Sequence, residues 1–115
     1  MDNPNVLEEL ATDFATKSRI KLKCDEVKTP IYTLPATLED TVSIQSIHSE
    51  ENAKKKSMAI ARLIAQKVEL ENGDRAFRNC LNKTAAEVIA TKVSPAVVQN
   101  IFLEIAKTAM SEEQL

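Results

Sequence analysis

The chain contains a single glycine, Gly73, which lies in the stretch VELENGDRAF at residues 68 to 77. Loops that wrap a phosphate or a dinucleotide need several glycines at fixed spacing, because the backbone must approach the ligand closely. One glycine therefore excludes both a P-loop and a dinucleotide fingerprint.

The same stretch fails as a calcium-binding loop. With Gly73 at the sixth position of an EF-hand, the first, third and twelfth positions would be Val68, Leu70 and Asn79. Calcium needs oxygen ligands there, ending in a bidentate glutamate. The stretch instead predicts a tight turn of type I′ with Asn72 and Gly73 at its centre, because both central residues of that turn need positive φ.

Net charge and hydropathy exclude two classes of partner. Fifteen Lys and Arg against seventeen Asp and Glu give a net charge of −2, without the basic excess that drives nucleic-acid binding. The basic run at residues 54 to 56 is interpreted as a solvated face, because no aromatic residue or second basic cluster accompanies it. No apolar run approaches the roughly 20 residues that span a bilayer, and the start MDNPNVLEEL does not resemble a secretion signal. We expect a soluble, cytosolic protein that binds neither nucleic acid nor membrane.

Few side chains in the sequence suggest chemistry. Cys24 and Cys80 lie far apart with no CxxC spacing, so we expect two buried free thiols. His48 is the only histidine, and nothing in the sequence orients a Cys–His nucleophile pair around it. We expect no catalytic residue, no metal site and no cofactor, and hence no enzyme.

The periodicity of apolar residues predicts one domain over residues 1–115, long enough to bury a real core. The fold class that we expect is α+β, mainly helical, with about four helices and a small antiparallel β element of two or three short strands. The expected elements are an N-terminal helix at 1–18, short strands at 19–47, a long helix at 49–69, a turn or hairpin at 70–77, and two closing helices at 79–110.

The N-terminal helix is predicted to be amphipathic. Asn3 is the expected N-cap, and Pro4 suits the first helical position, where a missing amide hydrogen costs nothing. Its apolar face holds Val6, Leu7, Leu10 and Phe14.

Three segments between residues 19 and 47 carry strand signals. RIKLKCD alternates between apolar and basic residues, which is typical of a half-buried strand, and TPIYTLPA is a short or edge strand because prolines flank it. TVSIQSI predicts a third strand at 41–47, although the preceding TLED is also compatible with the start of a helical turn. The apolar side of the first strand holds Ile20, Leu22 and Cys24.

Cap signals predict where two of the later helices begin. Ser49 is expected to start the long helix, with acidic residues in its first turn. Ser94 and Pro95 are the expected N-cap and first residue of the last helix. Within the CLNKTAAEVIATKV helix, the apolar residues expected in phase are Leu81, Ala85, Val88 and Ile89.

The last helix has more apolar surface than one contact face needs, with Asn100, Glu104 and Lys107 as its polar stripe. It is either a central helix packed on two sides, or a helix with one face in the core and another offered to a partner. The candidate partner-binding residues are Val98, Phe102, Leu103, Ala106 and Met110.

The order of these features resembles the tail assembly chaperones of long-tailed bacteriophages. The resemblance covers roughly residues 27 to 115 and includes the VSIQSIHSEEN helix start, the long helix, the acidic ENGDRAF turn and two closing helices. The turn between the helices is its most specific element.

The resemblance implies a small, mainly helical, non-enzymatic protein of the bacterial host cytoplasm. Such a protein binds helical segments of the tape measure protein through apolar surface and helps tail-tube subunits gather around it. A homo-oligomer is compatible with that role. The alternative is a self-assembling structural subunit of a head–tail connector, or another small oligomeric interaction protein, which would use the same apolar arc between identical copies.

Overall fold

The computed structural model describes residues 5–16 and 19–110 of the chain. Its elements, in chain order, are α1 (Val6–Thr16), β1 (Ile20–Lys21), β2 (Tyr32–Thr33), α2 (Leu38–Ser49), α3 (Ala53–Lys67), α4 (Ala85–Lys92) and α5 (Pro95–Met110). Among the described residues there are thus five helices and one two-stranded antiparallel sheet. The predicted α+β, mainly helical fold class is confirmed, with one helix more than expected. None of the described helices combines the length and the apolar character that crossing a bilayer requires.

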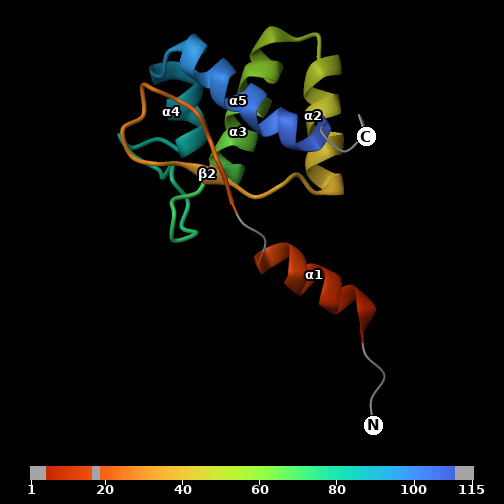
Figure 1. Cartoon of the computed structure of the whole chain (residues 1–115). Coiled ribbons are helices and arrows are strands. Elements are labelled where there is room, and N and C mark those ends of the chain that lie inside the picture. The colour runs from red at the N-terminus through yellow and green to blue at the C-terminus, as the bar shows by residue number, and fades with distance from the viewer. Residues whose placement is uncertain (1–4, 17–18, 111–115) are drawn as a thin grey trace.

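Helix α3 is the centre of the helical body, and α2, α4 and α5 all pack against it (Figure 1). Its buried face includes Ala61 and Ile64, and the small alanine side chain lets a neighbouring helix approach closely. Helix α5 also packs against α2 and contributes Ile101, Phe102 and Ile105 to the core. Most of the apolar arc of α5 is therefore used inside the chain, as the central-helix interpretation expects.

The small sheet ties the segment before α2 to the segment after α3. Ile20 pairs with Thr33 across the two strands, and Leu22 N donates to Ile31 O at 2.9 Å. Tyr32 and Glu69 then exchange two backbone hydrogen bonds, both of 2.8 Å. The strands are shorter than the alternating pattern predicted. On the side of the first strand that was expected to be apolar and buried, Leu22 is buried but Ile20 is exposed.

The strand predicted at 41–47 is wrong, because these residues belong to α2. Thr37 caps the helix: its hydroxyl accepts from Asp40 N at 3.2 Å, and the Asp40 carboxylate accepts from Thr37 N at 2.9 Å. This reciprocal capping box fixes the helix start. Ile44 and Ile47 are buried three residues apart, which fits a helical period. The TLED alternative was the correct interpretation.

Three predicted helix starts are displaced. Ser49 ends α2, and Asn52 caps α3 by accepting from Lys55 N at 3.0 Å. Helix α4 begins after Thr84, so Leu81 lies in a turn with φ +54° and is exposed rather than in phase with the helix. Asn5 caps α1 through Glu8 N at 3.2 Å, while Asn3 and Pro4 lie outside the described residues. The last helix does begin at Pro95, as predicted.

The turn around Gly73 is of a different type from the one predicted. Gly73 has φ +93°, but Asn72 is not among the described residues with positive φ, so a type I′ turn is excluded. Gly73 N donates to Leu70 O at 2.9 Å, and Leu70 N donates to Asp74 O at 2.8 Å, as in a three-residue hairpin loop. The Asn72 side chain accepts from Asp74 N at 3.0 Å, an arrangement that needs no positive φ at Asn72.

Candidate protein-binding groove

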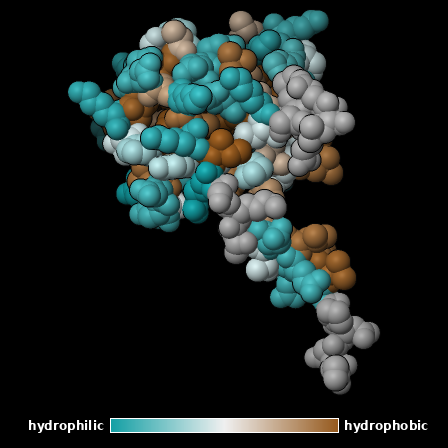
Figure 2. Space-filling view, in the orientation of Figure 1, coloured by the Kyte–Doolittle hydropathy of each residue, from teal (hydrophilic) through white to brown (hydrophobic). Residues whose placement is uncertain are grey.

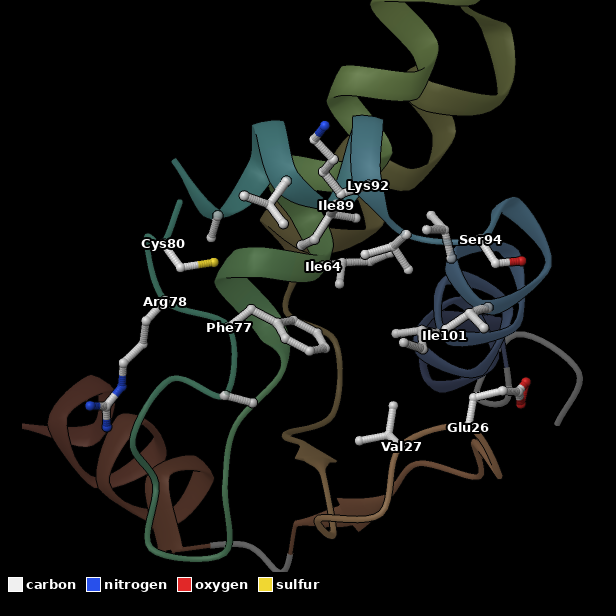
Figure 3. Close-up of a pocket in the computed structure, with 16 residues that line it drawn as sticks. Glu26, Val27, Ile64, Phe77, Arg78, Cys80, Ile89, Lys92, Ser94 and Ile101 are labelled. Atoms are coloured by element: carbon white, nitrogen blue, oxygen red, sulfur yellow. The ribbon is translucent and has the colours of Figure 1, made fainter. Parts of the chain in front are cut away.

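An open apolar depression of about 590 Å³ lies between α4 and α5, and we call it the α4–α5 groove (Figure 3). Helix α3 and two loops complete its walls. The apolar side chains that define it are Val27, Ile64, Phe77, Val88, Ile89, Val98 and Ile101. An apolar concave surface of this size is typical of sites that receive apolar side chains of a ligand.

Local structure holds α4 and α5 as the two helical walls of the groove. Thr84 caps α4 with a second capping box, in which Thr84 and Glu87 bond reciprocally. Val93 then takes an extended conformation, and the chain restarts as α5 at Pro95. Because only Val93 and Ser94 connect the two helices, α4 and α5 diverge from a shared corner while both rest on α3.

The remaining wall comes from the loop that follows the Gly73 hairpin. Ala76 N donates to Val68 O at 3.0 Å, which holds the start of this loop against the end of α3. Figure 3 shows the Phe77 ring directed into the depression and Val27 facing it from the opposite loop. Both side chains are half-buried. The turn therefore positions Phe77 as part of the groove.

The polar residues of the groove lie at its rim. Figure 3 shows Arg78 extending away from the depression, while the Cys80 sulfur is turned toward it. Glu26, Lys92 and Ser94 complete the polar lining. Apolar contact is consequently the main interaction that the interior can offer.

A second hollow of about 390 Å³ adjoins the groove across Phe77 and Arg78, which line both depressions. Its lining includes Arg62, Arg75 and Arg78, and no acidic side chain is among the described residues that line it. We call it the arginine hollow. Arg78 lies 3.8 Å from Asp74, and both side chains are largely exposed, so this pair neutralises little of the positive charge. One border of the apolar groove is therefore basic.

The structure places the residues predicted to bind a partner in different environments. Phe102 is 2% exposed and contacts His48 edge to face at 5.8 Å, and Ala106 is buried as well, so the chain's own core occupies both. Leu103 is 47% exposed but does not line the groove. Val98 lines the groove, and the side chain of Met110 lies outside what the structure describes.

Sequence reasoning missed most of the groove because its walls come from separate elements. Val27 and Val88 lie 61 positions apart in the sequence, and no single helical face contains them. The usable signal was Phe77, which follows the turn as an apolar residue returning to the body.

Two ionisable groups of the described residues, Asp40 and Glu104, have shifted pKa values that structural partners explain. Burial raises the pKa of Asp40, but hydrogen bonds from Lys67 and Thr37 and the Lys67 charge outweigh it, so this pKa lies below its ordinary value. The hydrogen bond from Lys107 lowers the pKa of Glu104. Asp40 joins α2 to α3 through a 2.7 Å bond with Lys67. No group of three His, Cys, Asp or Glu within the described ranges could hold a metal ion.

The two thiols are less buried than predicted. Cys80 is exposed and Cys24 is half-buried. Cys80 lies in the turn that precedes α4, where its backbone pairs with Lys83, and such a turn stays at the surface.

Comparisons of this chain with known protein families, with curated protein sequences and with solved structures each found no match.

Proposed function

We propose that this protein is a non-enzymatic tail assembly chaperone of a long-tailed bacteriophage, which binds helical segments of the tape measure protein in the α4–α5 groove. The observation that carries the proposal is an open apolar groove of about 590 Å³. The order of the sequence features, which resembles that family, supports it. The role needs no catalytic residue. It would be exercised in the cytoplasm of the bacterial host, where tail-tube subunits gather around the tape measure protein.

The physical basis is the helix-in-groove mode of recognition. A long amphipathic helix exposes apolar side chains three and four residues apart, which promotes aggregation until they are covered. A groove lined by Val88, Val98 and Phe77 covers such side chains without requiring a defined sequence. Binding of this kind suits a chaperone, because successive segments of one long helix can use the same surface.

Co-expression with the tape measure protein encoded beside this chain tests the proposal. The wild-type chain is expected to increase the soluble yield of that protein and to be recovered with it on affinity capture. Val88→Asp places a charge in the groove and is expected to abolish both effects, since burying an unpaired carboxylate is strongly unfavourable.

Val42→Asp is the matched control. Val42 is an exposed valine of α2 outside the groove lining, so the same substitution should leave the rescue intact. Circular dichroism checks that both variants keep the helical content of the wild type. The proposal is contradicted if the wild-type chain neither raises the soluble yield nor co-purifies, or if the two folded variants behave alike.

A further inference from the structure

Helix α1 carries an apolar face that the body of its own chain leaves uncovered. Val6, Leu7 and Leu10 are 61%, 75% and 62% exposed. Figure 1 shows α1 projecting from the helical body, and Figure 2 shows a hydrophobic side on it. A helix shorter than about 12 to 15 residues is only marginally stable alone in water, and α1 has 11. This face therefore requires a docking surface.

The spacing of the apolar residues suits a groove that receives one side of a helix. Val6, Leu10 and Phe14 follow one another at four-residue intervals, and Leu7 lies beside them. Over 11 residues such a stripe extends about 16 Å. This is the pattern of anchors that helix-in-groove recognition uses.

Charge selects the α4–α5 groove as the docking surface. The acidic residues of α1 are Glu8, Glu9 and Asp13, and no basic residue lies between Val6 and Thr16. On a helical wheel Glu9 and Asp13 border the apolar stripe on the Val6 side. The α4–α5 groove is likewise bordered on one side by the arginine hollow. With the stripe in the groove, the acidic border of α1 can face the arginines.

The exposed apolar residues of α2 form a poorer match to α1 than the α4–α5 groove does. Leu38 and Val42 are exposed on α2, but the first turn of α2 is acidic, with Glu39 and Asp40. An acidic helix placed there would meet charges of its own sign, which is unfavourable.

We infer that α1 of one copy docks in the α4–α5 groove of a second copy of this chain. In the structure α1 points away from the body that holds its own groove, so its apolar face is presented to another molecule (Figure 1). Each copy offers its α1 helix and its α4–α5 groove, so reciprocal exchange of α1 between two copies closes a symmetric dimer. A client helix and α1 of a second copy would compete for the same groove, so the dimer is the form without client. The inference does not depend on the identity of that client.

Cys80 provides a native probe for the contact, because its thiol lies at the groove rim. One copy carries Leu10→Cys, Cys24→Ser and Cys80→Ser, and the other carries only Cys24→Ser. After mixing and mild oxidation, peptide mapping is expected to find the disulfide between the introduced thiol and Cys80. The matched control replaces Leu10→Cys with Thr12→Cys on the polar face of α1, and loss of the disulfide is expected there.

A charge exchange tests the orientation independently. Arg78 is 69% exposed and Glu9 is exposed, so reversing either charge should leave the fold intact. Arg78→Glu alone and Glu9→Arg alone are each expected to reduce the dimer fraction measured by light scattering. The chain that carries both substitutions is expected to recover it, because the opposite charges meet again.

Three results would overturn the inference. The first is a wild-type chain that stays monomeric at every concentration tested. The second is equal cross-linking from Leu10→Cys and Thr12→Cys. The third is a disulfide that forms only within one chain when Leu10→Cys and Cys80 are on the same copy, which would mean that α1 folds back into its own groove. None of these bears on whether the tape measure protein is solubilised, so the two proposals fail separately.

Discussion

Helices α1 and α5 have the same kind of sequence and opposite surroundings. Both place apolar residues at helical spacing, but Ile101, Phe102 and Ile105 of α5 are buried, whereas three apolar residues of α1 are exposed, namely Val6, Leu7 and Leu10. The difference lies in their neighbours, because α5 packs against α2 and α3 whereas α1 projects from the body (Figure 1). An amphipathic pattern therefore predicts that a face needs cover, but not which surface provides it.

Among the truncations to alanine, the largest loss of stability is expected at Phe102, the aromatic residue of α5. Phe102→Ala removes a side chain packed in the core and leaves a cavity, so we expect a loss of about 3 to 5 kcal/mol in the free energy of unfolding. Denaturant unfolding followed by circular dichroism measures it.

Leu10→Ala in α1 is the comparison for this variant. Because Leu10 is exposed, we expect its substitution to change the free energy of unfolding of the dilute monomer by no more than about 0.5 kcal/mol. Comparable losses in the two variants would show that α1 belongs to the cooperative body, and the contrast between the helices would disappear.

The fold class could be predicted from the sequence because helical periods are local, whereas one helix and the groove could not. VSIQSI satisfies both an alternating and a helical pattern, and the Thr37–Asp40 capping box decides between them. The segment TLED already suggested a helix start, but the sequence did not show that Lys67 of α3 also bonds Asp40. The groove depends in the same way on how α4 and α5 sit on α3, which no local pattern encodes.

The second effect concerns the ion pair that joins α2 to α3 within the body. The side chains of Asp40 and Lys67 are only 15% and 14% exposed, so Asp40→Asn leaves a largely buried ammonium without its counter-charge. We expect a loss of about 2 kcal/mol in the free energy of unfolding. A substitution that left the unfolding midpoint unchanged would mean that the pair contributes no net stability.

The same pair predicts a pH dependence. Because the pKa of Asp40 is lower in the folded chain, its contribution is present above the ordinary aspartate value of about 4 and is lost as the pH falls through the folded pKa. We expect the stability of the wild type to fall more steeply than that of Asp40→Asn over this acidic range. Parallel pH profiles of the two proteins would contradict the assignment.

A smaller effect is expected at the hairpin, where the chain from α1 joins the body. Gly73 has φ +93°, and an added Cβ would lie 2.7 Å from the Arg19 guanidinium, which itself bonds Glu69 at 2.7 Å. The Arg19 side chain can move, so most of the cost of Gly73→Ala is backbone strain of about 1 to 2 kcal/mol. Gly73→Asn is the control, because asparagine tolerates positive φ better and should lose less. Equal losses in thermal unfolding would assign the effect to contact with Arg19 instead.

The smallest effect on stability is expected at the exposed side of α5, next to the buried Phe102. Leu103 follows Phe102 directly but is 47% exposed, so Leu103→Asp should change the free energy of unfolding by no more than about 0.5 kcal/mol, whereas Phe102→Asp should unfold the chain. Circular dichroism distinguishes these outcomes.

The folded Leu103→Asp variant also tests which surface binds the client, because Leu103 lies outside the α4–α5 groove. If the client binds in the groove, Leu103→Asp should still raise the soluble yield of the tape measure protein. Loss of that effect would mean that the client binds the outer face of α5.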